Sequence, residues 1–254
     1  MPVPVNTFKA ALKAGEVVWG CWLSTCHIGV AELMGDTGFD WLVLDGEHSP
    51  YDITAIRDQL IALDRSPSTP VVRVPIGEPW MIKQVLDSGA QTVLVPVVES
   101  GEQAELLAKS MIYPPAGIRG VGAAVARASR FSGIKDYSAT ADAQMCLIVQ
   151  VETRKGLAAL DDILGVEGVD GVFIGPADLS ADLGHMGNPT HPEVHDKIMD
   201  AIRRIRAAGK APGIMSLGDR SAEYIEAGAQ FLAIGADVSI LSDAAKALAA
   251  SVKG

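Results

Sequence analysis

Apolar runs recur along the chain, and segments with apolar residues at helical spacing separate them. The runs are apolar on both faces, as is typical of parallel strands that helices cover on both sides. We expect strands at residues 17–23, 41–45, 71–75, 92–97, 145–152, 171–175, 211–215 and 231–235. We expect helices at residues 28–36, 52–64, 79–88, 101–109, 154–164, 191–208, 219–227 and 238–252. The alternation predicts an α/β fold with a parallel sheet.

The predicted strands favour a closed barrel over an open doubly wound sheet. Neither GxGxxG nor GxxxxGK follows the first predicted strand, and such motifs are typical of open sheets that bind nucleotides. The length of 254 residues agrees with the roughly 250 residues of a (β/α)8 barrel. No linker divides the chain, so we expect residues 1–254 to form a single TIM-barrel domain.

Composition narrows the classes of function. The formal net charge is −10, from 21 Lys and Arg against 31 Asp and Glu, which disfavours binding to nucleic acid or to an anionic membrane. No stretch approaches the roughly 20 apolar residues of a membrane span, and the first residues do not resemble a signal peptide. We therefore expect a cytoplasmic protein. Three cysteines without a CxxC motif indicate reduced, buried thiols.

Residues 111–143 interrupt the regular alternation. The segment is far longer than an ordinary connection and is rich in Gly, Ala, Pro and Ser. Loops of this length in a compact domain are usually functional lids or interface elements, and the sequence leaves both open. We expect its arginines, Arg119, Arg127 and Arg130, to be solvated or to lie between subunits.

Two acidic residues follow successive predicted strands. Glu152 ends the run at 145–152, and Asp178 lies just past the run at 171–175, with a predicted helix between the two runs. In a β/α barrel the C-terminal ends of the strands form the mouth, where catalytic residues gather. Two carboxylates there make an oxygen-rich site that suits Mg²⁺ or Mn²⁺. The sequence therefore predicts a divalent metal site at the mouth.

The second predicted strand brings further polar residues to the same mouth. It runs directly into Asp45, Glu47 and His48. A histidine at a barrel mouth is a ready proton-transfer group, because its ordinary pKa lies near neutrality. The alternative is a histidine that caps a helix or simply lies in a loop.

The third predicted strand contains a charge among valines. Arg73 lies in the run VVRVP, where a lone guanidinium is unfavourable unless it is paired or meets an anionic ligand. We therefore expect a functional role, and the alternative is a structural salt bridge to Asp45 or Glu47. Gln150 shares the face of Glu152 by strand alternation. Trp22, at the end of the first predicted strand, either lines the pocket or packs in the core.

This set of groups suits chemistry on a 2-oxo acid. A metal on two carboxylates can chelate such a substrate and acidify its C3 protons, and a guanidinium can balance the charge of the enolate. No lysine ends a predicted strand, so an aldolase that forms a Schiff base is disfavoured. The pattern favours metal-dependent enolate chemistry on pyruvate.

Six motifs resemble those of the class II pyruvate aldolases of the HpcH/HpaI family. They are WLVLDGEHSPYD, VVRVP, SGAQTVLVPVVES, YPPAGIRGVG, VQVET and GVFIGPADLSADLG, in this order along nearly the whole chain. The resemblance implies a barrel of the phosphoenolpyruvate/pyruvate type and a homohexamer that exchanges its C-terminal helices between subunits. It also implies reversible aldol cleavage of 4-hydroxy-2-oxo acids to pyruvate and an aldehyde.

The resemblance also assigns roles to residues. Its metal ligands match Glu152 and Asp178, its general base His48, its transition-state stabiliser Arg73, and its pyruvate contacts Gln150 and the backbone at Ala177. Asp45 lies in the same signature as His48. Asp87 matches an acid that raises the basicity of that histidine. Residues 215–219 are candidates for the aldehyde pocket.

Two other functions stay open from the sequence. One is a related lyase that acts on an acyl-CoA thioester, as citramalyl-CoA lyase does, although the net charge of −10 disfavours a groove for the CoA phosphates. The other is a non-catalytic barrel that serves as a scaffold. The presence of Glu152, Asp178, Arg73 and His48 together disfavours this alternative. Neither the aldehyde nor the choice among Mg²⁺, Mn²⁺ and Co²⁺ follows from the sequence.

Overall fold

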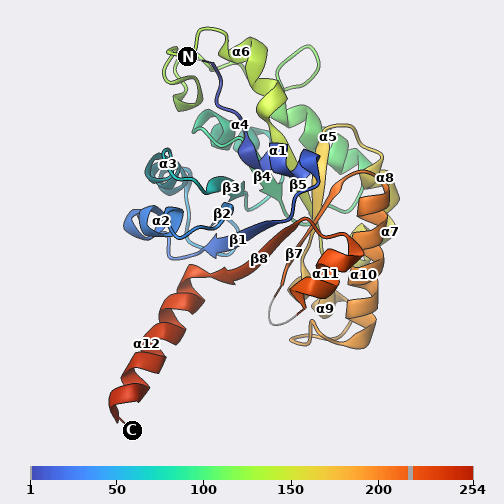
Figure 1. The fold of residues 1–254 in the computed structure, drawn as a ribbon. Coiled ribbons are helices and arrows are strands. Elements are labelled where there is room, and N and C mark those ends of the chain that lie inside the picture. Colours follow the sequence, from blue (N-terminus) through green and yellow to red (C-terminus); the bar gives the residue numbers. More distant parts are fainter. Residues whose placement is uncertain (1, 217–219, 254) are drawn as a thin grey trace.

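Eight parallel strands close into a barrel, with helices around it (Figure 1). The computed structural model describes residues 2–216 and 220–253. Each strand pairs with the next along the chain, and the last pairs with the first. The strands are β1 (Val18–Leu23), β2 (Trp41–Asp45), β3 (Thr69–Arg73), β4 (Thr92–Val95), β5 (Cys146–Val151), β6 (Val169–Ile174), β7 (Ala211–Met215) and β8 (Phe231–Ala236). The predicted (β/α)8 barrel is confirmed.

The helices follow the predicted order, with three additions. They are α1 (Thr7–Ala14), α2 (Ile28–Gly35), α3 (Ile53–Ala62), α4 (Pro79–Asp87), α5 (Gly101–Met111), α6 (Tyr137–Thr140), α7 (Arg154–Ala158), α8 (Leu160–Leu164), α9 (Pro176–Asp182), α10 (Pro192–Ala207), α11 (Ser221–Ala227) and α12 (Asp237–Lys253). Two 3₁₀ turns, η1 (Arg127–Ser129) and η2 (Ala141–Gln144), flank α6. The sequence pattern did not predict α1, α6 or α9, and the helix predicted at 154–164 is divided into α7 and α8.

Polar side chains fix where several helices begin. Asn6, Asp52, Ser100 and Thr153 each accept a hydrogen bond from a backbone N–H in the first turn of α1, α3, α5 and α7, respectively. These caps satisfy donors that have no partner within the helix. Because α3, α5 and α7 directly follow strands, their caps also fix how the chain leaves the mouth of the barrel.

The interior of the barrel is filled by aromatic rings. Trp22, Trp41, Phe173 and Phe231 lie inside it, with neighbouring ring centroids 5.4–6.3 Å apart. Phe8 of α1 adds a fifth ring, 5.5 Å from Trp41 and 5.6 Å from Phe231. The barrel is therefore a packed core. Helix α1 closes it at the N-terminal ends of the strands, which leaves the mouth, at their C-terminal ends, as the place for a ligand.

Helix α1 lies across the N-terminal ends of the strands. The Asn6 side chain donates to Thr92 Oγ1 at 2.9 Å, where β4 begins, and Thr7 lies 2.6 Å from Thr69, where β3 begins. The Leu12 carbonyl accepts from Gln230, just before β8, at 3.0 Å. These bonds fix α1 on the side of the barrel opposite the mouth.

The long segment 111–143 packs near the base of β4 and β5, away from the mouth. Its Arg119 is buried, forms an ion pair with Asp87 at 2.9 Å, and has its guanidinium carbon 4.5 Å from the ring centroid of Tyr113. Arg127 pairs with Asp64 at 2.8 Å. The expectation that these arginines are solvated is therefore wrong for Arg119, because two tyrosines and a carboxylate enclose it. The segment is not a lid over this chain's own mouth.

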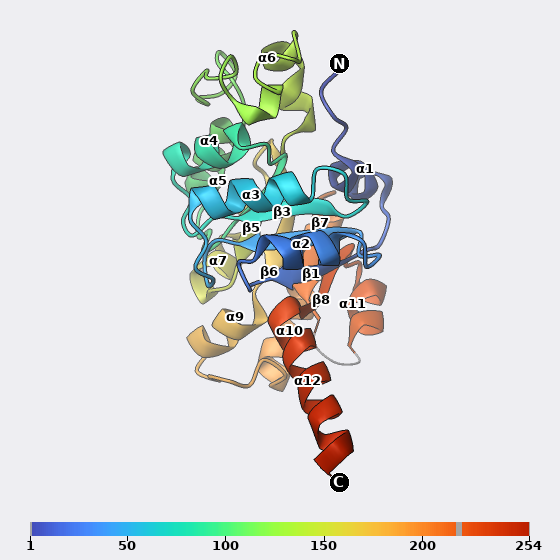
Figure 2. The same ribbon diagram turned by 90° about the vertical axis from the view of Figure 1, so that its left-hand side faces the viewer.

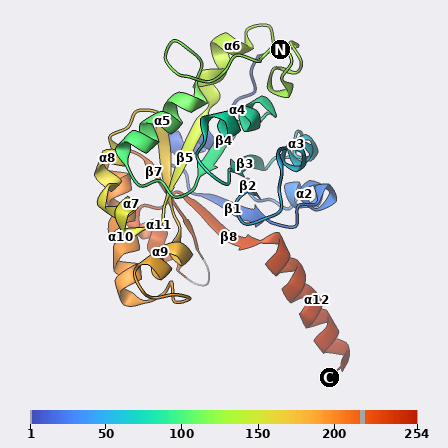
Figure 3. The ribbon, with the colours of Figure 1, turned by 180° about the vertical axis from the view of Figure 1, so that it is seen from behind.

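Helix α12 extends away from the barrel (Figures 1, 2 and 3). Asp237 at its start is buried and accepts hydrogen bonds from the backbone of Ser24 and Thr25 at 2.8 and 3.1 Å. Beyond this anchor the apolar side chains are exposed, among them Leu241, Leu248 and Val252. Within one chain, α12 therefore covers no barrel. No helix within residues 2–216 and 220–253 is both long and apolar enough to span a membrane.

Candidate active site at the barrel mouth

A buried ion pair joins the ends of two adjacent strands. Arg73 and Asp45 are register partners at the ends of β3 and β2. Arg73 Nε donates to Asp45 Oδ1 at 2.8 Å, and Nη2 lies 2.8 Å from Oδ2. Arg73 Nη1 also lies 2.6 Å from Glu47 Oε2. The guanidinium predicted at the mouth is therefore there, and it is held between two carboxylates.

The Asp45 carboxylate also shapes the loop that follows it. Its Oδ1 accepts from the backbone of Glu47 at 3.1 Å and of His48 at 3.3 Å. Burial alone would raise the pKa of Asp45, but the hydrogen bond and charge of Arg73, with these two N–H groups, lower it. The carboxylate is therefore ionised at neutral pH. Gly46 permits the turn, since a Cβ there would lie 2.6 Å from the Arg73 carbonyl oxygen.

His48 is exposed at the rim of the mouth. Its Nε2 lies 3.9 Å from Glu47 Oε1, and 67% of its side chain is exposed. His48 lies in the turn that follows β2, and Asp52, not His48, caps the next helix, so the role of His48 in proton transfer stays a prediction. Its ring is free to meet a substrate that enters from solvent.

Three acidic groups face one another at the mouth. Glu152 is buried just after β5, and burial, with the nearby charges of Asp178 and Glu47, raises its pKa. Burial likewise raises the pKa of Glu47, and the charges of Asp45 and Asp178 add to this. A buried carboxylate close to two other carboxylates binds a proton or a cation more readily, because burial and like charges both disfavour its negative charge. Glu47 is therefore a third acid beside the two predicted ones.

Backbone groups fix the orientation of Glu152. Its Oε1 accepts from the N–H of Val97 at 3.0 Å, and its Oε2 contacts Gln150 Nε2. Val97 has φ 53°, a left-handed conformation that is rare for a β-branched residue. A Cβ on Gly175 would lie 2.4 Å from Glu152 Oε2, so only glycine fits there. Strain of this kind is common at functional sites, and the sequence pattern did not reveal the role of Val97.

Asp178 belongs to the first turn of α9 and not to a strand. Gly175 precedes the helix and Pro176 is its first residue, which is a favoured position for proline. Asp178 and Ala177 are both exposed. A carboxylate in the first turn is stabilised by the helix dipole, and the first N–H groups have no partner within the helix. The helix thus presents an acid and free donors toward the mouth.

Gln150 and Trp22 lie beneath these groups. Gln150 is buried, and its Oε1 has no hydrogen-bond partner among the described residues. Trp22 packs inside the barrel, and the Arg73 guanidinium carbon lies 5.3 Å from the centroid of its ring. Trp22 is therefore a core residue whose ring lies beside the Arg73 guanidinium, and its place in the wall of the pocket stays a prediction.

Asp87 does not join this group within one chain. It is the last residue of α4, five positions before β4 begins, so it lies toward the base of the barrel. Its carboxylate pairs with Arg119 and not with His48. Of the candidate aldehyde-pocket residues 215–219, Met215 ends β7 and Ser216 is buried. Residues 217–219 lie outside the described part of the chain.

The arrangement can hold a divalent cation. Glu152 and Asp178 offer hard oxygen ligands, which Mg²⁺ and Mn²⁺ prefer. The raised pKa of Glu152 shows that its negative charge is not balanced by a nearby positive group. The buried Gln150 Oε1 has no hydrogen-bond partner among the described residues, so it can accept one from a ligand. Beside them, Arg73 supplies a positive charge and His48 a titratable ring.

Comparisons with known proteins agree with this geometry. A family model described as HpcH/HpaI aldolase/citrate lyase matches residues 19–244. The chain is 54% identical to a hydroxypyruvate/pyruvate aldolase of Roseobacter denitrificans, over 100% of this chain and 99% of the relative. It is 54% identical to a 4-hydroxy-2-oxo-heptane-1,7-dioate aldolase of Klebsiella pneumoniae, over 96% and 93%. An aldolase/citrate lyase family structure from Burkholderia cenocepacia superposes with TM-score 0.94, 39% identity and coverage of 98% and 100%.

Proposed function

The chain belongs to the HpcH/HpaI aldolase/citrate lyase family, and we propose that it is a class II pyruvate aldolase. It would cleave 4-hydroxy-2-oxo acids reversibly into pyruvate and an aldehyde. The observation that carries this proposal is the buried Arg73, paired with Asp45 and Glu47, where Glu47 lies close enough to Asp178 and Glu152 for their charges to interact. The full-length relatives are named as aldolases, which supports a carbon–carbon lyase.

We propose that Glu152 and Asp178 bind the divalent ion, which is Mg²⁺, Mn²⁺ or Co²⁺. Burial, with the nearby charges of Asp178 and Glu47, raises the pKa of Glu152, and a bound ion would compensate the charge of its carboxylate. When bound, it supplies Lewis acidity to the carbonyl oxygen of the 2-oxo acid. Glu47 Oε2 lies 2.6 Å from Arg73 Nη1. We therefore propose that Glu47 adds negative charge near the ion but does not bind it.

Arg73 would stabilise the enolate that forms from pyruvate. Its guanidinium is fixed by Asp45 on one edge and by the Trp22 ring alongside. A charge that is already oriented stabilises a developing oxyanion without reorganisation. Asp45 therefore acts through Arg73 and through the turn that carries His48, as a positioning residue.

The first turn of α9 would donate hydrogen bonds to the substrate carboxylate, and Gln150 would accept one from bound solvent in the same pocket. The Gln150 amide reaches the mouth beside Glu152, and its Oε1 is free to accept a hydrogen bond. The N–H groups at Ala177 and Asp178 are available donors, as in the first turn of any helix. Together these groups would orient the 2-oxo acid in the plane that its enolate requires.

His48 would move the proton of the C4 hydroxyl group. It lies at the rim, where the aldehyde half of the substrate must sit if the pyruvate half is bound deeper. A histidine is suited to this transfer near neutral pH. The acid matched by resemblance, Asp87, does not support it within this chain.

The acyl-CoA alternative finds little support at the mouth. A CoA ester brings several phosphate charges, which basic side chains usually bind. The mouth residues described here combine one guanidinium with the acids Asp45, Glu47, Glu152 and Asp178. Pyruvate carries a single negative charge, which this balance can accommodate when a divalent ion is bound.

We further propose that the protein assembles into a homohexamer in which α12 packs on a neighbouring subunit. The apolar side chains of α12 are exposed in one chain, as are Val121, Val125 and Phe131 of the segment 111–143. Exposed apolar groups on two projecting elements are typical of surfaces that subunits bury. The segment would then be an interface element.

The activity is tested with purified protein freed of metal and supplied with Mg²⁺, Mn²⁺ or Co²⁺. Pyruvate and hydroxypyruvate are offered in turn with a panel of aldehydes, and the products are ranked by kcat/KM. We expect aldol products that depend on the added ion. Turnover of acetyl-CoA or citramalyl-CoA esters, with no aldol product from either 2-oxo acid, would replace the proposed function by the acyl-CoA alternative.

A further inference from the structure

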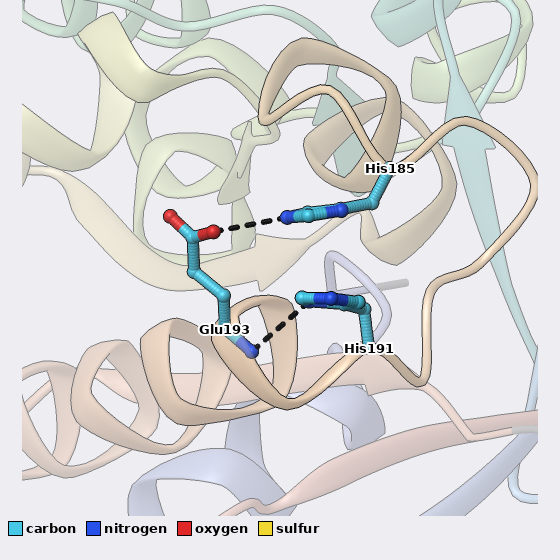
Figure 4. Close-up of side chains that lie close together, drawn as sticks. All are labelled: His185, His191 and Glu193. Atoms are coloured by element: carbon cyan, nitrogen blue, oxygen red, sulfur yellow. Dashed lines mark hydrogen bonds and ion pairs between the residues drawn. The ribbon is translucent and has the colours of Figure 1, made fainter.

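Three side chains converge near the start of α10 (Figure 4). His185 Nε2 lies 2.9 Å from Glu193 Oε2. The ring of His191 stacks on that of His185, with centroids 3.5 Å apart and planes inclined by 14°. One nitrogen of each histidine and one Glu193 oxygen all lie within 4.8 Å of one another. The proposed aldolase mechanism uses none of these residues.

The backbone brings the two histidines together without help from their side chains. The N–H of His185 donates to the Ser180 carbonyl in α9 at 2.7 Å. The N–H of Asn188 then donates to the His185 carbonyl at 2.9 Å, and the N–H of His191 donates to the Asn188 carbonyl at 3.1 Å. Two successive turns therefore fold the connection between α9 and α10 back on itself, so the side chains are held close before any ligand arrives.

We propose that His185, His191 and Glu193 bind a divalent transition-metal ion, for which Zn²⁺ is the best match. Two imidazoles and one carboxylate form a well-known ligand set for zinc, with water in the fourth position. Nitrogen ligands distinguish this site from the mouth, where carboxylate oxygens favour Mg²⁺ or Mn²⁺. The inference does not depend on the proposed aldolase function.

The distances are close to those that zinc requires. Around a tetrahedral ion with bonds of about 2.0–2.1 Å, ligand atoms lie about 3.4 Å apart. Since the present separations are at most 4.8 Å, side-chain rotation alone can close the difference. Because each imidazole binds an ion in the plane of its own ring, one of the stacked rings must turn.

Turning the His191 ring gives up its stacking on His185 and one long hydrogen bond. Its Nδ1 accepts the N–H of Glu193 at 3.3 Å and so caps α10. Glu193 is exposed, so water can take over this N–H when the ring turns. His191 then exchanges its long hydrogen bond with the Glu193 N–H for a bond between its neutral imidazole and the ion.

A bound ion would join the end of α9 to the start of α10. Helix α9 carries Ala177 and Asp178 in its first turn, while His185 follows its last turn and Glu193 lies in the first turn of α10. The ion would thus fix the connection between two helices and stabilise the fold through residues other than the acids of the mouth.

The test is a zinc titration of the full chain by calorimetry in the presence of excess Mg²⁺, which competes for oxygen ligands such as carboxylates. We expect one equivalent of Zn²⁺ to bind the unaltered protein. His185→Gln keeps a donor for Glu193, and His191→Asn keeps a cap for α10, so both variants should fold. Each should weaken zinc binding by more than about tenfold, since even the loss of an indirect partner of a ligand has that effect.

His195→Gln is the matched control. His195 lies on the same helix and pairs with its own acid, Glu223, at 2.8 Å, so this variant should bind zinc as the unaltered protein does. Bound Cu²⁺ should show nitrogen splitting in its electron paramagnetic resonance spectrum, also in a Glu152→Gln/Asp178→Asn variant. No zinc uptake with Mg²⁺ present, unchanged affinity in His185→Gln and His191→Asn, or an equal loss in His195→Gln would each overturn the proposal.

Discussion

Arg73 and Asp45 end adjacent strands and meet through two contacts of 2.8 Å, Nε to Oδ1 and Nη2 to Oδ2. This side-by-side pairing fixes the plane of the guanidinium, because both of its contacts lie in that plane. The third nitrogen remains for Glu47 and for a ligand in the mouth. The fold therefore determines both the position and the orientation of the Arg73 guanidinium.

Replacement of Arg73 should abolish enolate chemistry as a whole. We expect Arg73→Ala to lose both aldol cleavage and oxaloacetate decarboxylation, each by at least about 10²–10³-fold, the usual effect of removing an oxyanion donor. Arg73→Lys should recover little, because an ammonium cannot reproduce the planar pairing with Asp45. The measurement is kcat for the two reactions in each variant. An Arg73→Lys enzyme with near-normal rates would show that charge alone suffices.

Replacement of His48 should separate the two reactions. Aldol cleavage requires removal of the hydroxyl proton, so His48→Ala should slow it by about 10²–10⁴-fold. Decarboxylation of oxaloacetate involves no such proton, so this rate should fall much less. The ratio of the two rates is measured after metal binding has been verified. If both rates fall equally, His48 positions the metal or the substrate and is not the base.

Removal of the metal should stop the aldol reaction. We expect EDTA to abolish activity and Mn²⁺, Co²⁺ or Mg²⁺ to restore it in the unaltered protein. Glu152→Gln should need a much higher ion concentration, whereas Glu99→Gln should not, since Glu99 pairs with Lys155 at 3.0 Å outside the acidic group. Full activity after exhaustive chelation, or a lysine adduct trapped by borohydride, would contradict the metal-dependent mechanism.

Without metal, the charge on Glu152 should destabilise the fold near neutral pH. Burial raises the pKa of Glu152 above its ordinary value of 4.5, so the folded state binds its proton more tightly than the unfolded state. The resulting stabilisation is complete below about pH 4.5 and is lost as the pH rises through the higher folded pKa. In EDTA, Glu152→Gln should therefore raise the melting temperature at pH 7, with a smaller gain as the pH falls toward 4.5. Equal melting curves at pH 7 would contradict this.

Removal of residues 238–254 should dissolve the assembly. The truncation keeps Asp237, whose carboxylate caps the chain at Ser24 and Thr25, so each barrel should stay folded. We expect light scattering at micromolar concentration to give a hexamer for the full chain and a smaller species for the truncated one. A full chain that is monomeric at that concentration would refute the exchange of α12.

The strands were predictable because burial on both faces leaves a continuous apolar run. All eight begin and end within two residues of the predicted positions. Short amphipathic elements left no such signal. Helix α9 has only seven residues and begins directly after β6, so the pattern assigned Asp178 to a strand end and not to a helical turn.

Site residues at the ends of strands could be predicted from the sequence, whereas the places of residues elsewhere could not. Asp45, Arg73 and Glu152 lie at or just past strand ends, so topology alone brings them together. Arg119 follows no periodic pattern, and its burial between Tyr113 and Asp87 depends on how residues 111–143 fold back. The left-handed conformation of Val97 is likewise set by the surrounding packing.

Two glycines in the strands restrict how the barrel interior can change. A Cβ on Gly20 would lie 2.2 Å from the Trp41 ring, and one on Gly213 would lie 2.1 Å from the Phe231 ring. Each large ring thus occupies the volume that its neighbouring strand leaves empty. In related sequences, bulk inside the barrel should therefore move between partners, with a smaller residue at position 41 or 231 wherever position 20 or 213 gains a side chain.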